Sequence, residues 1–302
     1  MPASPPAPTA GPTPAPTAAP ARRSGGTLIT VAPTGAETAK ADAPALPVTM
    51  AELVATAQAC EAAGAGMVHV HIRDEQALPS LDPVRLRDTV QALREQTSLV
   101  VQLSTGGSVR DPYDARLAVL DAEPDSCSLT CGTVNFGDDV FLNPWPFMSE
   151  LYALTQEREI VPEFELFDLG QVAALHRLLD EHGAPYGGQV HCDLVMGVPG
   201  GIPGTLDALA AAVRALPEGA TWSATGVGRW TLPVALAALA AGGHLRVGME
   251  DTLTFTRGVP VRDNAQLVER AAQLAALADR PALTTDDARA MLRVKDRTGA
   301  RR

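Results

Sequence analysis

The sequence predicts an α/β protein with a (β/α)8 TIM-barrel fold, and two observations support this prediction. From Gly26 onward, short β-branched or apolar runs alternate with longer Ala- and Leu-rich segments of helical period. Eight such β-then-α pairs over about 250 residues match the size and number of units in this barrel. A doubly wound open sheet is the alternative, but no G-x-G-x-x-G motif follows the first expected strand. We therefore expect one barrel domain over residues 26–302.

The expected elements follow in order along the chain. Strands are expected at residues 27–32, 67–72, 99–103, 126–130, 160–166, 188–194, 221–224 and 245–248. Helices are expected at 49–63, 82–95, 111–121, 143–157, 168–182, 205–216, 231–241 and 263–278, with an appended helix at 286–294. Thr49 and Asp82 are typical N-cap residues, Pro83 suits a first helical position, and Gly183 suits a helix end.

The N-terminal segment differs in composition from the expected barrel. Residues 1–25 are mostly Pro, Ala, Thr and Ser. Because proline lacks a backbone donor and this composition cannot build a core, we expect a disordered tail. Arg22 and Arg23 lead into Gly25 and Gly26 rather than into an apolar segment, which argues against a secretory signal.

The net charge and the cysteines restrict partners and location. The 302 residues include 24 Lys and Arg against 35 Asp and Glu, a formal charge of −11, so neither nucleic acid nor an anionic membrane is an expected partner. No apolar run approaches the ~20 residues that span a bilayer. The four scattered cysteines fit a reducing compartment, and we expect a cytoplasmic protein.

Polar residues gather at the ends of the expected strands, where barrel enzymes carry their active sites. These residues are Thr34, Glu37, His69, His71, Asp74, Ser104, Thr105, Gly106, Gly107, Ser128, Thr130, Glu163, Glu165, His191, Asp193, Glu250 and Asp251. His69 and His71 give the sharpest signal, because residues i and i+2 of a strand project to the same face about 7 Å apart. Two such imidazoles can hold one metal ion; the alternative is a core histidine and a lid histidine that never meet.

A carboxylate-rich segment follows the last expected strand. Glu250 can supply the third ligand of a His2Glu site, and Asp251 can act as a base that Arg246 keeps anionic. The alternative is a surface ion pair. Residues 104–107 (STGG) suit a carboxylate or small-anion site, and a plain glycine turn is equally compatible.

Two other groups are interpreted as core or wall residues. His191-Cys192-Asp193 looks like a second metal site, but strand alternation points Cys192 away from its neighbours. Cys127 and Cys131 lack the second pair that a zinc knuckle needs.

Six separated motifs carry a family resemblance: APTGAE at 32–37, AGAGMVHVHIRD at 63–74, QLSTGG at 102–107, GTVNFGDD at 132–139, GVPGG at 197–201 and GGHLRVGMED at 242–251. Over residues 27–292 the chain resembles the β-keto acid cleavage enzymes. The resemblance implies a zinc-dependent, homotetrameric barrel enzyme that condenses a β-keto acid with acetyl-CoA to give acetoacetate and a new CoA thioester.

The resemblance also implies roles for individual residues. His69, His71 and Glu250 would hold the zinc, and Asp251 would be the base, supported by Arg246 and Glu165. The substrate carboxylate would lie against Ser104, Thr105, Gly106 and Gly107, with Ser128 at the pocket wall in place of the family's Thr.

Glu37 is the residue that selects the substrate class under this resemblance. In aminohexanoate-cleaving members a Glu at this place pairs with the substrate ammonium. We therefore expect a cationic β-keto acid as substrate. The first candidate is 3-keto-5-aminohexanoate, with 3-aminobutyryl-CoA as product, in a reaction of lysine degradation. The second candidate is dehydrocarnitine.

Two other functions are considered. Amidohydrolase-type zinc hydrolases also use H-x-H in a barrel, but there the pair ends strand 1 and further histidines end strands 5 and 6. Here the pair ends the second expected strand, and the fifth supplies only Glu163 and Glu165. A non-catalytic metal-binding barrel would leave Arg246, Asp251 and Glu165 without a purpose.

Overall fold

The computed structural model describes residues 25–297, so the expected tail lies outside the described residues apart from Gly25. Eight parallel strands form a closed barrel in the order β1, β12, β11, β10, β9, β6, β5, β2. The strands are β1 (Ile29–Val31), β2 (Met67–Val70), β5 (Val100–Leu103), β6 (Ser126–Thr130), β9 (Val161–Leu166), β10 (His191–Met196), β11 (Thr221–Gly226) and β12 (His244–Val247). The predicted (β/α)8 barrel is confirmed.

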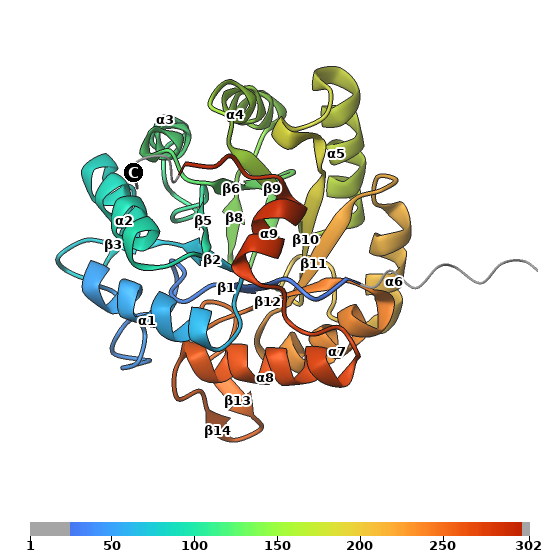
Figure 1. Cartoon of the computed structure of the whole chain (residues 1–302). Coiled ribbons are helices and arrows are strands. Elements are labelled where there is room, and N and C mark those ends of the chain that lie inside the picture. The colour runs from blue at the N-terminus through green and yellow to red at the C-terminus, as the bar shows by residue number, and fades with distance from the viewer. Residues whose placement is uncertain (1–24, 298–302) are drawn as a thin grey trace, which may run out of the picture.

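Helices surround the barrel on its outside (Figure 1). They are α1 (Met50–Ala62), α2 (Pro83–Gln96), α3 (Tyr113–Ala118), α4 (Trp145–Glu157), α5 (Leu169–His182), α6 (Leu206–Ala215), α7 (Thr231–Ala241) and α8 (Asn264–Leu277). Thr49 and Glu52 form a capping box at the start of α1, and the Asp82 carboxylate accepts from Arg85 N at the start of α2. The main core lies between these helices and the outer faces of the strands.

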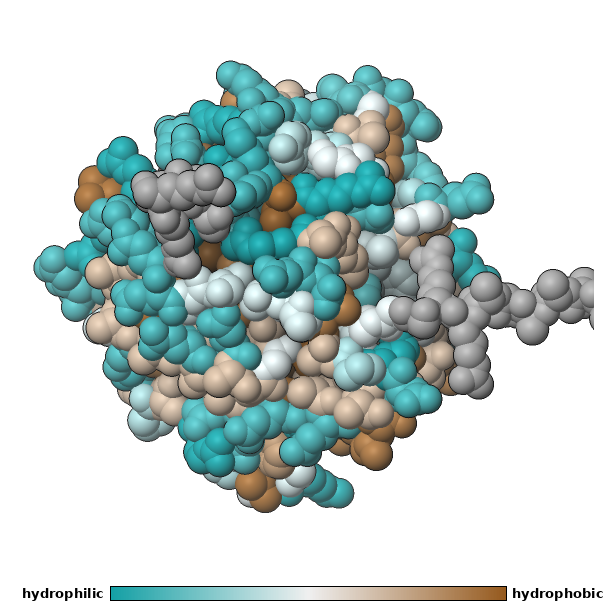
Figure 2. Space-filling view, in the orientation of Figure 1, coloured by the Kyte–Doolittle hydropathy of each residue, from teal (hydrophilic) through white to brown (hydrophobic). Residues whose placement is uncertain are grey.

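A ninth helix, α9 (Thr285–Leu292), covers the N-terminal end of the barrel. Ala288 and Leu292 pack against Leu28, Met67 and Val100, which lie at the starts of their strands. Figure 1 views the barrel from this end, with α9 in front. Figure 2 shows hydrophilic side chains over most of the same face. Because α9 closes this end, the opposite end is the one open to a ligand. No helix among the described residues is long and apolar enough to cross a membrane.

Three hairpins that we did not expect follow strands of the barrel. They are β3–β4 (Ile72–Arg73 and Pro79–Ser80), β7–β8 (Val134–Phe136 and Asp139–Phe141) and β13–β14 (Thr254–Thr256 and Val259–Pro260). The expected strand at 67–72 is consequently divided, and His71 lies between β2 and β3. The expected helix at 111–121 is likewise split into α3 and a 3-10 helix, Val119–Ala122.

A buried histidine links the last strand to the first. Leu28 N donates a hydrogen bond to Nδ1 of His244, at 3.0 Å, next to the β1–β12 pairing that closes the barrel. Burial lowers the pKa of His244 to about 4, and the nearby Arg280 contributes. His244 is therefore neutral in the folded protein between pH 4 and the value near 6.5 at which an unfolded histidine titrates.

This difference in pKa makes the stability of the fold depend on pH. Between pH 6.5 and 4 the unfolded state binds one proton more at His244, so the free energy of unfolding falls as the pH falls. His244→Asn keeps an acceptor for Leu28 N and removes this proton. We expect the variant to lose about 3 kcal/mol less stability than the wild type over that range, measured by urea unfolding. Exposed His176→Asn is the control, and equal pH slopes for wild type and His244→Asn would contradict the assignment.

Candidate active site

A cavity of about 260 Å³ opens at the C-terminal end of the barrel. It is lined by residues that lie in or follow β1, β2, β5, β9, β10, β11 and β12, among them Thr34, Glu37, His69, His71, Ser104, Glu165, Arg246, Glu250 and Asp251. A larger cavity of about 640 Å³ lies beside it, between α1, the β3–β4 hairpin and α2, and His71 lines both. Because the buried ionisable side chains converge on the smaller cavity, we place the candidate active site there.

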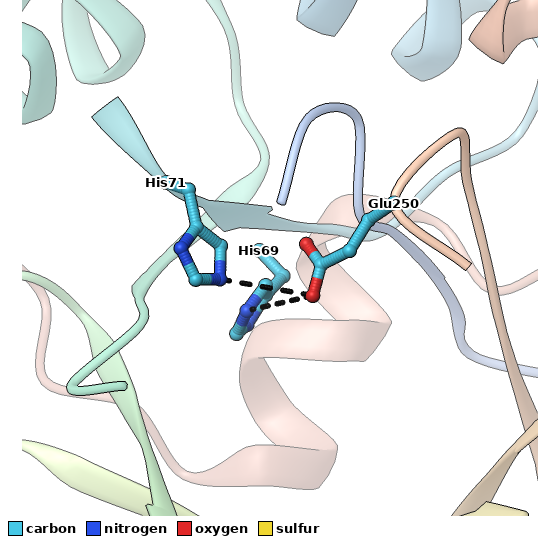
Figure 3. Close-up of side chains that lie close together, drawn as sticks. All are labelled: His69, His71 and Glu250. Atoms are coloured by element: carbon cyan, nitrogen blue, oxygen red, sulfur yellow. Dashed lines mark ion pairs between the residues drawn. The ribbon is translucent and has the colours of Figure 1, made fainter. Parts of the chain in front are cut away.

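His69 and His71 approach each other and Glu250 in this cavity (Figure 3). Their ring centroids are 5.2 Å apart, and the Nε2 atoms lie 3.8 Å (His69) and 3.7 Å (His71) from Oε1 of Glu250. The His69 side chain is 1% exposed and that of His71 10%. The two histidines therefore meet, as predicted, although His71 lies just beyond the end of β2.

Two glycines allow Glu250 to reach the histidines. A side chain at Gly248 would lie 1.9 Å from the Ala32 carbonyl oxygen, so only glycine lets the chain pass β1 this closely. Gly35 has φ +65°, and a Cβ there would lie 2.6 Å from Cγ of Glu250. Glu250 N also donates to the Ala32 carbonyl at 3.1 Å. The turn after β12 is thus held against β1 with its carboxylate directed into the cavity.

Arg246 is the centre of the charged part of the site. Its side chain is 4% exposed, and its guanidinium contacts Glu250 (2.5 Å), Glu165 (3.1 Å), Asp251 (3.1 Å) and Asp193 (3.9 Å). Burial alone would lower the pKa of Arg246, but the surrounding carboxylates outweigh it and hold that pKa well above its ordinary value. The guanidinium therefore stays charged.

The carboxyl groups respond to Arg246 in different ways. Burial raises the pKa of Glu165 and of Asp251 to about 7. For Glu250 burial is outweighed by Arg246 and the two histidines, which bring its pKa down to about 2. Glu250 is thus an anion at neutral pH, whereas Asp251 and Glu165 are poised to exchange protons there.

The His–His–Glu cluster fits a divalent cation. One ligand atom from each of His69, His71 and Glu250 lies within 4.8 Å of the others, and it is the one such metal-compatible group found among the described residues. Burial chiefly lowers the pKa of both histidines, that of His69 to about 3, so their rings are neutral and keep lone pairs for a metal. Oε2 of Glu250 is buried without a hydrogen-bond partner. Two imidazoles and one carboxylate are a donor set typical of catalytic zinc.

The loop at residues 104–107 contributes Ser104, Gly106 and Gly107 to the cavity. Gly106 N donates to Oγ of Ser104 at 3.1 Å, and Arg116 Nε donates to the Thr105 carbonyl at 2.8 Å. These bonds fix the loop conformation. Glu37 is exposed and lines the cavity on the β1 side.

Two residues expected at the substrate lie behind the cavity wall. Thr105 Oγ1 donates to the Ser128 carbonyl at 2.8 Å, and Thr105 N donates to Oγ of Ser128 at 3.4 Å. Both residues are 2% exposed, and neither lines the cavity. The neighbouring Thr130 donates to Oε2 of Glu165 at 2.9 Å and so orients that carboxyl group.

The residues interpreted as core or wall are buried. Cys192 packs in the main core, whereas Asp193 contacts Arg246 and accepts from Thr225 Oγ1 at 2.6 Å. His191 hydrogen-bonds Thr221 and lies outside the cavity lining.

Sequence reasoning missed an apolar wall of the cavity. It consists of Phe136, Phe141, Phe167, Val109, Val195, Val198 and Val227. Two of the phenylalanines come from the β7–β8 hairpin. The signal that could have located this hairpin is Gly137-Asp138 between two short apolar runs, since such a pair favours a two-residue hairpin turn.

Comparisons with known proteins identify the relatives of this chain. The family model described as beta-keto acid cleavage enzyme matches residues 27–294. A 3-keto-5-aminohexanoate cleavage enzyme from Fusobacterium nucleatum subsp. nucleatum is 35% identical over 270 residues, covering 89% of this chain and 98% of that protein. The 3-oxoadipate:acetyl-CoA acetyltransferase of Cupriavidus necator is also 35% identical, covering 88% of this chain and 94% of its own length.

Solved structures support the fold. The apo structure of ObcA aligns with a TM-score of 0.69 at 20% identity, over 83% of this chain and 66% of that one. The family match spans nearly all the described residues, and the curated relatives are matched over most of their length. The resemblance inferred from the sequence is therefore confirmed, and the chain belongs to the β-keto acid cleavage enzyme family.

Proposed function

We propose that this protein is a zinc-dependent enzyme that converts a cationic β-keto acid and acetyl-CoA into acetoacetate and a new CoA thioester. The observation that carries the proposal is the convergence of His69, His71 and Glu250 beside the Arg246–Asp251 pair in one cavity. Family membership supports the reaction class. The preferred substrate is 3-keto-5-aminohexanoate, with 3-aminobutyryl-CoA as the second product.

His69, His71 and Glu250 would hold the zinc. When bound, a zinc ion supplies a Lewis acid that polarises the substrate ketone and stabilises the enolate charge. Arg246 fixes Glu250 and Asp251 in place and offsets part of the negative charge in the cavity. The substrate carboxylate binds to the backbone of Gly107 and to the Ser104 hydroxyl, which accepts from Gly106 N and can still donate to the ligand.

Asp251 performs the proton transfers. It accepts a proton from the carbon between the ketone and the carboxylate, and this carbon then attacks the thioester carbonyl of acetyl-CoA, which releases the CoA thiolate. The thiolate adds to the carbon of the substrate ketone. The bond between this carbon and the carbon that attacked acetyl-CoA then breaks, which gives the new CoA thioester and the acetoacetate carbanion. Asp251 returns the proton to the acetoacetate carbanion. Glu165 contacts Arg246 and Thr130 and carries part of the negative charge around the guanidinium.

The substrate class rests on Glu37. A carboxylate at the exposed side of the cavity favours a cation at the far end of the substrate, which disfavours dicarboxylates such as 3-oxoadipate. Dehydrocarnitine is the second candidate, because Phe136, Phe141 and Phe167 present aromatic surface to the same cavity and quaternary ammonium groups bind such surfaces.

Three further parts of the proposal concern the assembly, the pathway and the location. The family resemblance is the basis for a homotetramer and for a role in lysine degradation. All four cysteines are free and buried, which fits a cytoplasmic protein. A zinc hydrolase of the amidohydrolase type is disfavoured, because β9 offers Glu163 and Glu165 where histidine is needed and His191 on β10 lies outside the cavity.

The reaction is tested by following acetoacetate from zinc-loaded protein, acetyl-CoA and a panel of cationic and neutral β-keto acids. We expect acetoacetate from 3-keto-5-aminohexanoate, and Asp251→Asn to reduce turnover at least a hundredfold while zinc content is unchanged, because the base is lost. Acetoacetate from no acid would favour the hydrolase. Full turnover by Asp251→Asn would exclude Asp251 as the base.

The metal ligands are tested by zinc content. His69→Ala and Glu250→Ala each remove one of three ligands, so neither variant should retain stoichiometric zinc after dialysis, measured by mass spectrometry. His191→Gln, which changes a buried histidine outside the cavity, is the matched control and should keep its zinc. Full zinc occupancy in both ligand variants would exclude the assigned site.

The role of Glu37 is tested by substrate selectivity. Glu37→Gln removes the charge at the cavity entrance, and a hydrogen bond between charged groups contributes about 1.5–3 kcal/mol. We expect the KM for 3-keto-5-aminohexanoate to rise roughly 10- to 100-fold and the KM for a neutral β-keto acid to stay unchanged. Glu75→Gln, in the larger neighbouring cavity, is the control. An equal rise in KM for both substrates would show that Glu37 does not select the substrate.

A further inference from the structure

We propose that Gln102, held in one orientation by Glu163, positions His69 for cation binding by keeping the proton on Nδ1 and the lone pair on Nε2. The proposal rests on the metal site proposed above. Neither Gln102 nor Glu163 lines the cavity, and both lie inside the barrel below it, on β5 and β9. They act through His69, so they are positioning residues.

The contact between Gln102 and His69 is short and dry. Oε1 of Gln102 lies 2.6 Å from Nδ1 of His69, and each residue is 1% exposed. The two residues are paired across β2 and β5 in the barrel register. An amide oxygen can only accept a hydrogen bond, so Nδ1 must carry the proton. Nε2, the atom directed at Glu250, is then left with the lone pair that a metal needs.

The orientation of the Gln102 amide is fixed by the hydrogen bonds of its NH2 group. Nε2 of Gln102 donates to Oε2 of Glu163 at 3.0 Å and to Oγ of Ser126 at 3.1 Å. A reversed amide would place its oxygen against the Glu163 oxygen and its NH2 group against the Nδ1–H of His69. The first contact is repulsive when that Glu163 oxygen carries no proton, and the second requires His69 to move its proton from Nδ1 to Nε2, the atom directed at Glu250. Glu163 therefore determines which tautomer His69 adopts, through one intervening amide.

The chain of contacts does not require Glu163 to be charged. Burial, reinforced by Asp193, raises the pKa of Glu163 to about 8, and a neutral Glu163 that carries its proton on Oε1 still offers Oε2 to the NH2 group of Gln102. A neutral Glu163 also adds no further negative charge beneath a cavity that already holds several carboxylates. What matters is the acceptor position of Glu163, which lies on β9, 2% exposed.

Loss of the hydrogen bond from His69 to Gln102 should weaken the metal site, because Nδ1 of His69 has no other acceptor for its proton among the described residues. Its Nδ1 faces the closed barrel interior, where a proton without an acceptor is unfavourable. Without Gln102, the His69 ring is more stable with its proton on Nε2 or in a rotated orientation. Either change removes the lone pair of Nε2 from the cavity. Loss of a partner of this kind typically reduces metal affinity 10- to 100-fold.

The first measurement is the zinc dissociation constant, obtained by competition with a chelator. Gln102→Met, which keeps the length of the side chain, should weaken zinc binding 10- to 100-fold. Glu163→Leu should weaken it similarly, whereas Glu163→Gln should stay close to wild type, because its amide oxygen can take the place of the carboxylate. Thr221→Val is the control, since it removes the hydrogen-bond partner of Nδ1 in His191, a buried histidine outside the cavity. Wild-type affinity in Gln102→Met would overturn the proposal.

The second measurement does not need the metal and therefore separates this proposal from the metal site itself. Nitrogen-15 NMR of the metal-free, histidine-labelled protein reports which ring nitrogen of His69 is protonated, with His69→Asn identifying the signal. We expect Nδ1–H in the wild type and in Gln102→Glu, which keeps an acceptor, and a shift toward Nε2–H in Gln102→Met. If the wild type binds no zinc but shows this tautomer pattern, the metal site fails and the positioning stands. An unchanged tautomer in Gln102→Met would refute the positioning.

Discussion

The buried guanidinium of Arg246 is the interaction on which the rest of the site depends. Removing a charge from water costs several kcal/mol unless opposite charges accompany it, and here Glu165, Asp193, Glu250 and Asp251 surround a single cation. One arginine cannot balance them all. Burial raises the pKa values of Glu165 and Asp251 to about 7, so protons can offset part of the excess charge, and the low pKa of Glu250 keeps an anionic ligand for the proposed second cation. The proposed base and the proposed metal site therefore have the same electrostatic origin.

Barrel closure brings these charges together from distant parts of the chain. Arg246 is paired with Thr30 across β12 and β1, and Glu250 reaches His69 and His71 only because Gly248 lets its turn lie against Ala32. A glycine at such a position carries no chemistry, yet any side chain there would displace the carboxylate. The same closure buries Gln102 and Glu163 below the cavity, where water cannot replace a lost hydrogen bond.

The sequence predicted the strands and helices better than it predicted the cavity. Strand 126–130 and helix 231–241 match β6 and α7 at both ends, because apolar period and helix signals are local properties. His69, His71 and Glu250 were singled out by residue type and by their place near the end of a strand, and the structure brings these three side chains together. Thr105 and Ser128 were expected at the substrate from the family resemblance, but in the structure they bond to each other behind the cavity wall. Such orientations depend on contacts between distant segments, and a single sequence does not reveal them.

The cavity joins a charged floor to an apolar wall, and the proposed reaction needs both. A carbanion and a thioester are each destroyed by water, so the site must exclude it while keeping ionic groups in place. Phe136 packs edge-on against Phe141 and Phe167, at centroid distances of 6.4 and 6.0 Å. Gly137 N donates to the Pro199 carbonyl at 3.0 Å, and a Cβ at Gly200 would lie 2.3 Å from the Asn135 carbonyl oxygen, so the hairpin and the 197–201 loop are locked together. This wall is built into the fold, and it lowers the local dielectric constant around Arg246 and its carboxylates, which strengthens the electrostatic balance that holds the site together.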